Sequence, residues 1–208
     1  MILIGQYDSP FVRRVAVTLR LYGLAYEHRP WSVWGDAEKI AEFNPLRRVP
    51  VLLLEDGTAL TECFAILDNL DDQVGAERAL LPRSGPARRE GLRLVALCSG
   101  LADKAVSLLY EGILRKEPLG TWQNRCTRQI LDTLALLERD RTKRGTRNFL
   151  GAELSHADVA FTCVFRFARE AHPTLIELAR FPALSAHAAR CEEQEAFRAV
   201  YQPITNSL

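Results

Sequence analysis

Three short stretches in the first third of the chain carry residues that suit thiol chemistry or peptide binding. Ser9 precedes a proline and a helical pattern, Pro50 precedes an apolar run, and Glu62 and Cys63 open a second helical pattern. Each stretch also has a purely structural interpretation. The elements that hold these residues therefore matter as much as the residues themselves.

Ser9 has two compatible roles. Serine is a preferred helix N-cap, and Pro10 then stands at the first helical position, where proline is common. On local grounds alone this structural role is the stronger interpretation. Ser9 also follows a predicted first strand, at the end where α/β sheets place their ligands. A helix N-terminus favours a nearby anion, including a thiolate, to which a hydroxyl can donate a hydrogen bond.

Pro50 stands just before the apolar run 51–54. A proline can begin a strand because it need not donate to the ladder, and a trans bond is the ordinary expectation. In a cis bond the backbone of Val49 would turn outward and pair with a peptide-like ligand, as an added strand does.

Glu62 and Cys63 lie in the first turn of a predicted helix, with Thr61 as its expected N-cap. Backbone N–H groups at a helix start bind carboxylates, and the Glu62 carboxylate can accept a ligand ammonium group. An acid near a helix N-terminus also simply suits the helix dipole.

The elements around these residues follow the order β-α-β-α-β-β-α over residues 1–78. Strand patterns occur at 2–6, 25–31 and 51–60, the last as a hairpin with a turn at 55–58, and helical patterns occur at 11–23, 36–45 and 61–72. Gly23 can end the first helix. Two strands joined through a helix imply parallel pairing, and the hairpin adds an antiparallel strand.

Strand signals vanish after residues 79–87, which have the prolines and glycine of a linker. Residues 88–208 predict an all-helical domain, with long helices at 88–115 and 121–143. A very apolar helix at 155–171 is expected in the middle of a bundle. Ser155 and Asp158 have the spacing of a capping box at its start. The expected fold is therefore α/β followed by all-α.

Composition excludes several classes of function. The net charge is +1, which gives no electrostatic case for nucleic acid or an anionic membrane. The basic residues of the second half, Arg144 among them, are interpreted as solvated helix faces. No apolar run approaches the roughly 20 residues of a membrane span. The five cysteines form no CxxC pair, and the histidines have no metal-ligand spacing, so we expect reduced thiols, no metal and a cytoplasmic location.

Together and in this order, the motifs are specific. The chain resembles a cytosolic glutathione S-transferase of the bacterial serine type over nearly its whole length. The matching stretches are "DSPFVRRV", "NPLRRVP", "DGTALTECFAI", "LLP", "LSHADVAF" and "FPALSAHAARCEE". The resemblance implies a thioredoxin-like glutathione-binding domain with a cis bond before Pro50, an all-helical second domain and a homodimer. It also implies conjugation of glutathione to a small apolar electrophile, in detoxification.

The resemblance assigns roles residue by residue. Ser9 matches the hydroxyl that stabilises the glutathione thiolate, and Val49 matches the residue whose backbone pairs with the cysteinyl unit. Glu62 and Cys63 match the pair that holds the γ-glutamyl group. Arg48 matches a position, usually lysine, near the glycyl carboxylate. Tyr7 is a rival stabiliser of the thiolate, because other classes use a tyrosine at the end of this strand.

The electrophile site is expected to be apolar. Its candidate residues are Phe11, Trp31, Trp34, Lys104, Leu108 and Tyr110, with Trp34 favoured among the aromatic residues because it lies in a loop-like stretch. Ordinary core packing explains the aromatic residues equally well.

The chain departs from the family pattern in ways that keep other functions open. Cys63 replaces the usual serine, and its S–H is a weaker donor. Arg47 stands where glycine is frequent, and Glu195 where proline is common. A cysteine is missing at position 9, which argues against a glutaredoxin-like role. The alternatives are a non-catalytic binding or regulatory protein of the stringent-starvation-protein type, and a glutathione-dependent isomerase or peroxidase.

Overall fold

The computed structural model describes residues 1–204, which form two compact units. The first contains Met1–Leu81 and the residues from Gln194 onward, and the second contains Pro82–Glu193. The segment from Gln194 thus groups with the first unit, although the sequence pattern assigns it to the all-helical domain at 88–208. The domain boundaries expected at 78 and 88 remain a prediction. Within residues 1–204, no helix has the length and apolar character needed to cross a membrane.

The first unit is built on a small mixed sheet. Its strands are β1 (Ile2–Ile4), β2 (Glu27–Arg29), β3 (Val51–Leu53) and β4 (Ala59–Thr61), in the spatial order β2-β1-β3-β4. β1 pairs parallel with β2 and antiparallel with β3, and β3 and β4 form the antiparallel hairpin. The predicted order of elements is confirmed, and β2 is shorter than its sequence pattern suggests.

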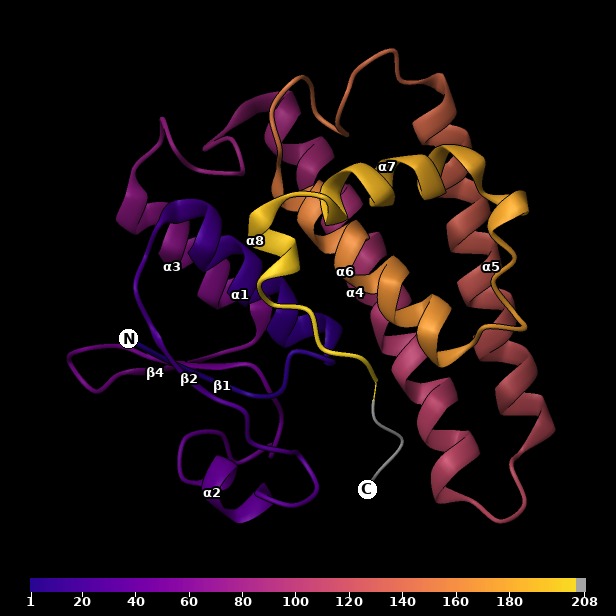
Figure 1. The fold of residues 1–208 in the computed structure, drawn as a ribbon, viewed down its shortest axis with the longest axis horizontal. Helices are drawn as coiled ribbons and strands as arrows, with labels where there is room; N and C mark the ends of the chain where they lie inside the picture. Colours follow the sequence, from indigo (N-terminus) through magenta and orange to yellow (C-terminus); the bar gives the residue numbers. More distant parts are fainter. Residues whose placement is uncertain (205–208) are drawn as a thin grey trace. The chain divides into compact units, whose positions relative to one another are not determined.

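Helices cover both faces of this sheet (Figure 1). α1 (Pro10–Tyr22) and α3 (Cys63–Val74) pack together on one face, and α2 (Ala37–Ala41) lies on the other. α2 contributes Ile40 to a cluster with Ile4 and Val51. α1 ends at Gly23, as predicted, because its φ of 67° is a left-handed conformation that glycine adopts without a Cβ penalty.

Residues 195–200 return to α1. The short helix α8 (Glu195–Arg198) contacts α1. Arg13 of α1 is fully buried. Its Nη2 donates to the carbonyl of Phe197 at 3.0 Å and its Nε to that of Val200 at 3.3 Å. A charged side chain is seldom fully buried unless it is paired in this way. Arg13 therefore joins Phe197 and Val200 to α1.

The second unit is entirely helical. Its helices are α4 (Gly85–Leu114), α5 (Gly120–Lys143), α6 (His156–Ala171) and α7 (Pro182–Glu192), with a 3₁₀ turn at Leu178–Arg180. α6 is buried along most of its length and packs against α4 and α7, as its apolar sequence predicts. The capping box of Ser155 and Asp158 is present. Asp158 also accepts the backbone N–H of Phe149 at 2.8 Å, which ties the preceding loop to the helix start.

Candidate functional site

Ser9 caps α1, and its hydroxyl donates no hydrogen bond to residues 1–204. It follows β1 by a short loop, and its Oγ accepts the backbone N–H of Val12 at 3.4 Å. The side chain is half-buried. A hydroxyl has one donor and two acceptor positions, so the Ser9 proton can still be donated. The N-cap role and a role in binding an anion are therefore compatible in one geometry.

The start of α3 lies against the start of α1. Cys63 is the first residue of α3, and its Sγ donates to the carbonyl of Phe11 at 3.2 Å. Two helix N-termini are thus neighbours, and both favour negative charge. The prediction of Thr61 as N-cap is wrong. Thr61 pairs with Val51 as the last residue of β4, which suits a β-branched side chain.

Glu62 occupies the position before α3 in an unusual conformation. Its φ and ψ are 66° and 133°, outside the regions that non-glycine residues ordinarily adopt. Such strain persists only where neighbouring structure imposes it, and it is common at ligand sites. Here it turns the chain from β4 into α3 and leaves the Glu62 side chain exposed.

The bond between Val49 and Pro50 is cis, as the resemblance implies. The local sequence favours a trans bond, and that prediction is therefore wrong. Among residues 1–204, neither the N–H nor the C=O of Val49 makes a hydrogen bond. Val49 precedes β3 and is not part of its ladder. Its peptide groups are consequently available to an extended ligand.

Gly5, which was not among the residues predicted for the site, allows Val49 and Val12 to approach it closely. Its φ is 125°, and a Cβ there would lie 2.5 Å from Cγ2 of Val12 and 2.8 Å from Cβ of Val49. Only glycine fits such a close approach. Gly5 therefore brings the cis-proline loop against the segment that leads to Ser9. A glycine directly after the first strand was the available signal.

Arg48 and Glu62 place opposite charges beside the Val49 backbone. Arg48 Nη1 lies 3.3 Å from Glu62 Oε1, and both side chains are about half exposed. An exposed ion pair of this kind contributes about 0–1 kcal/mol, so a ligand that carries both charges can replace either partner at little cost. The structure thus brings together Ser9, Val49, Pro50, Glu62 and Cys63, with Arg48 beside them.

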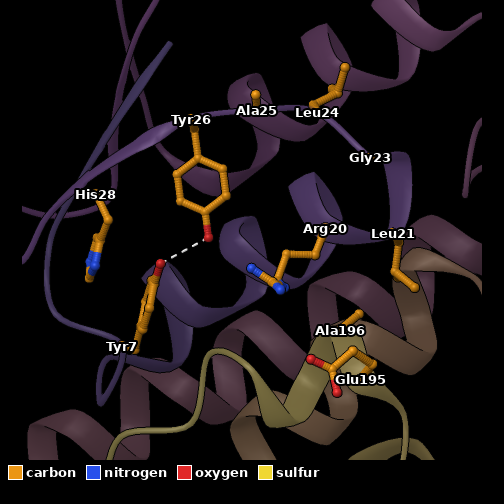
Figure 2. Close-up of a pocket in the computed structure, with 10 residues that line it drawn as sticks. All are labelled: Tyr7, Arg20, Leu21, Gly23, Leu24, Ala25, Tyr26, His28, Glu195 and Ala196. Carbon is orange, nitrogen blue, oxygen red and sulfur yellow. Dashed lines mark hydrogen bonds between the residues drawn. The ribbon is translucent and has the colours of Figure 1, made fainter.

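Tyr7 points elsewhere. Its hydroxyl is 2.8 Å from that of Tyr26, and its ring stacks on His28 with centroids 3.8 Å apart. These three residues line a pocket on the β2 side of α1 (Figure 2). Burial, followed by the hydrogen bond with Tyr26, raises the pKa of Tyr7 above its ordinary value. Tyr7 therefore remains a phenol at neutral pH.

The remaining predicted residues are spread over both units. Phe11 lies in the first turn of α1 beside Cys63, and Trp34 is 44% exposed in the turn before α2. Trp31 packs against the buried cluster of Ile4, Ile40 and Val51. On α4 of the second unit, Lys104 stacks over the ring of Trp122 at 5.4 Å. Leu108 and Tyr110 are also on α4, and both are half-buried.

Among the residues the structure describes, no group of three or more His, Cys, Asp or Glu side chains is arranged to hold a metal ion.

Comparison with known proteins places both halves of the chain in one family. Residues 3–78 match the family model "Glutathione S-transferase, N-terminal domain", and residues 120–190 match "Glutathione S-transferase, C-terminal domain". The Escherichia coli K12 protein YibF, described as an uncharacterized GST-like protein, is 32% identical over 114 residues. That alignment covers 53% of this chain and about half of YibF, 54% of its length.

Solved structures are similar over the whole chain. A glutathione S-transferase from Methylobacterium radiotolerans, in complex with glutathione sulfonate, has a TM-score of 0.90 and 28% identity, with 100% of this chain and 98% of that chain covered. A glutathione transferase family member from Pseudomonas fluorescens Pf-5, with bound S-(propanoic acid)-glutathione, has a TM-score of 0.81 and 29% identity, with 98% and 100% covered. Because the two family models together span more than half of its residues, the chain belongs to the glutathione S-transferase family.

Proposed function

We propose that the protein is a glutathione transferase that joins the glutathione thiolate to a small apolar electrophile. The observation that carries the proposal is the free backbone of Val49, next to a cis-proline and close to the adjoining N-termini of α1 and α3. Such a site suits a peptide-like molecule that also carries negative charge. Glutathione has both properties, and relatives with 28–29% identity were solved with glutathione derivatives bound.

Ser9 is proposed as the residue that stabilises the thiolate. A free thiol has a pKa near 8.5 and is mostly protonated at neutral pH, whereas only the thiolate attacks. The O–H group of Ser9, which can donate a hydrogen bond, and the N-terminus of α1 both favour the anion and so lower the pKa of the bound thiol. Tyr7 is a weaker candidate, because its hydroxyl is already bonded to Tyr26.

The other parts of glutathione have proposed partners around Ser9. The Val49 backbone pairs with the cysteinyl unit, as a short added strand would. The Glu62 carboxylate accepts the γ-glutamyl ammonium group, and the backbone N–H groups at the start of α3, at Cys63, hold the γ-glutamyl carboxylate. Arg48 pairs with the glycyl carboxylate. The ion pair between Arg48 and Glu62 means that the two charged groups lie next to each other beside Val49.

For the electrophile, Phe11 and Trp34 of the first unit are proposed as apolar contacts. The contributions of Lys104 and Leu108 stay predictions from the sequence, as do homodimerisation, a cytoplasmic location and a role in detoxification.

Substitution of Ser9 tests the mechanism. We expect Ser9→Ala to retain binding to immobilised glutathione and to lower kcat/KM with 1-chloro-2,4-dinitrobenzene by roughly ten- to a hundredfold, because one donor to a developing anion is lost. The pH–rate profile should shift to higher pH, since the bound thiol becomes less acidic. Ser9→Thr should restore most of the activity.

Tyr7→Phe is the matched comparison, and it should leave turnover nearly unchanged. Loss of turnover in Tyr7→Phe together with full activity in Ser9→Ala would transfer the role to Tyr7. A wild-type protein that neither binds the glutathione matrix nor turns over the aryl halide would overturn the transferase assignment.

A second candidate function is a non-catalytic binding or regulatory protein of the stringent-starvation-protein type. It is favoured by one observation, the donation of the Cys63 thiol to the Phe11 carbonyl, because a donor used internally is lost to a ligand. A protein that is neither retained on immobilised glutathione nor active on aryl halides would support this alternative. Turnover of maleyl or hydroperoxide substrates alone would instead indicate the isomerase or peroxidase.

A further inference from the structure

The loop that carries Ser9 has no regular secondary structure of its own. It joins β1, which ends at Ile4, to α1, which begins at Pro10. Within the loop, the backbone N–H of Ser9 donates to the carbonyl of Gln6 at 3.2 Å. A single turn of this kind does not fix a loop, because loops are more mobile than the elements they connect. Contacts from other parts of the chain therefore determine where Ser9 lies.

β2 and the residue before it hold one part of this loop. The hydroxyl of Tyr7 is 2.8 Å from that of Tyr26, and its ring stacks on His28 (Figure 2). His28 is also hydrogen-bonded through Nε2 to the carbonyl of Gly5 at 2.8 Å. These contacts hold the ring of Tyr7, whereas its peptide N–H is held by a different segment.

That segment contains Gln202. The peptide N–H of Tyr7 donates to Oε1 of Gln202 at 3.0 Å, across 195 positions of the sequence. Among residues 1–204, this is the one acceptor that the N–H has. Tyr7 is half-buried, and an N–H removed from water is costly to leave without a partner. The side-chain amide of Gln202 therefore holds the loop two positions before Ser9.

Gln202 is fixed in turn by the buried residues that precede it. Phe197 and Val200 are 0% and 1% exposed, and their carbonyls accept from Arg13 of α1 at 3.0 and 3.3 Å. Gln202 comes two positions after Val200. The side-chain carbonyl of Gln202 is therefore presented to Tyr7 from a firmly held backbone.

We propose that Gln202 is a positioning residue for Ser9. The loop runs into α1, α1 holds residues 197–200 through Arg13, and Gln202 holds the loop, so these contacts close a circuit around Ser9. The inference rests on the proposed transferase function, in which Ser9 donates to the glutathione thiolate. A hydrogen bond weakens steeply with poor geometry, and a misplacement of about 1 Å can lower a rate roughly a hundredfold. By fixing the Tyr7 peptide, Gln202 keeps the Ser9 hydroxyl within reach of the sulfur.

Gln202→Met tests this role, because it removes the acceptor and keeps the length of the side chain. At about pH 6.5, we expect the thiolate fraction of bound glutathione, measured by its ultraviolet absorbance, to fall by roughly three- to tenfold. The kcat/KM for 1-chloro-2,4-dinitrobenzene at saturating glutathione should fall by a similar factor, and the pH–rate profile should move to higher pH. The KM for glutathione should change by less than about twofold, because no part of glutathione is assigned to Gln202.

Gln194→Met is the matched control. It makes the same chemical change in the same returning segment, and the side chain of Gln194 makes no cap hydrogen bond to α8. The thiolate fraction and kcat/KM of this variant should equal those of the wild type. Gln202→Glu keeps an acceptor of the same length. Amide exchange at Tyr7 should therefore be as slow in Gln202→Glu as in the wild type, and faster in Gln202→Met.

The same substitution combined with Ser9→Ala separates positioning from a general loss of structure. If Gln202 acts through Ser9, Gln202→Met should have no further effect on kcat/KM once the Ser9 hydroxyl is gone. A purely structural role would lower kcat/KM by the same factor with and without Ser9→Ala, and that result would contradict the proposal.

The inference and the proposed function fail in different ways. Equal thiolate fractions in Gln202→Met and Gln194→Met, or equal amide exchange at Tyr7 in Gln202→Met and the wild type, would overturn the role of Gln202 and leave the transferase intact. A wild-type protein without turnover, or full activity in Ser9→Ala, would remove the proposed mechanism and with it the role of Gln202.

Discussion

At the scale of single residues, the candidate site depends on which donors are free and which are committed. The hydroxyl of Ser9 accepts a hydrogen bond from the Val12 N–H and keeps its proton, whereas the thiol of Cys63 donates to the carbonyl of Phe11. Cys63 is also buried, with 6% exposure. A ligand carboxylate at the start of α3 must therefore rely on backbone N–H groups.

Cys63→Ser should raise the affinity for glutathione by about two- to tenfold. A hydroxyl is a stronger donor than a thiol, and when it donates to the ligand carboxylate in place of the Phe11 carbonyl it exchanges a neutral acceptor for a charged one, a gain of about 1 kcal/mol. Isothermal titration with glutathione measures the change. Cys63→Ala is the matched control and should match or weaken wild-type binding. Equal dissociation constants for the serine and alanine variants would contradict a role for this donor.

At the scale of elements, ion pairs join α4 to the end of α5. Glu90 on α4 accepts from Nε and Nη2 of Arg93, each at 2.9 Å, and also pairs with Arg144, which follows α5. Arg93 in turn pairs with Asp140 of α5. The interpretation of Arg144 as part of a solvated face is therefore wrong. Its charge pairs with Glu90, which is 54 residues away in the sequence on the neighbouring helix α4.

These pairs give the second unit an acid-sensitive contribution to stability. Hydrogen bonds from Arg93, and then from Arg144, lower the pKa of Glu90 from 4.5 to about 2. A carboxyl whose pKa is lower in the folded state stabilises the fold above its unfolded pKa, and this contribution is lost as pH falls from about 4.5 to 2. The side chain is about one-third exposed, so solvent screening reduces the contribution to about 1 kcal/mol.

Glu90→Gln should therefore unfold about 1 kcal/mol more easily at pH 7 and should lose less stability than the wild type between pH 4.5 and 2.5. Urea unfolding at several pH values, followed by circular dichroism, measures both effects. Glu117→Gln, an exposed acid in the loop between α4 and α5, is the control and should parallel the wild type. Parallel curves for Glu90→Gln would show that the network does not contribute.

At the scale of the whole molecule, the first unit is made from two distant parts of the chain. Phe197 and Val200 are buried in it, and their carbonyls are held by Arg13 of α1. Nearby, Oε1 of Gln202 accepts the backbone N–H of Tyr7 at 3.0 Å. The segment that ends in Ser9 is thereby tied to the far end of the chain, and the site depends on residues from both parts.

Arg13→Met should destabilise the protein by about 2–4 kcal/mol, because two buried carbonyls lose their partner. Chemical unfolding measures the loss. In the native state, amide exchange should become faster around residues 197–202. Arg89→Met, at an exposed position of α4, is the control and should change stability by no more than about 0.5 kcal/mol. An Arg13→Met protein as stable as the control would mean that the returning segment does not depend on this residue.

Much of the fold could be predicted from the sequence because the signals are local. The order of strands and helices follows from the spacing of apolar residues, Gly23 and Ser9 mark the ends of α1, and Ser155 with Asp158 marks the start of α6. Each of these depends on groups within a few residues of one another. The site motifs could likewise be located, because they sit at the ends of those elements.

Only the tertiary structure decided what those residues do. The donation from Cys63 to Phe11, the pairing of Tyr7 with Tyr26 and the return of residues 197–200 to Arg13 all join groups that local pattern does not relate. A hydrogen-bonding group has few positions to fill, and packing determines which neighbour fills them. The sequence by itself therefore determined the elements and the candidate residues, and the packed fold determined which of their donors remain free for a ligand.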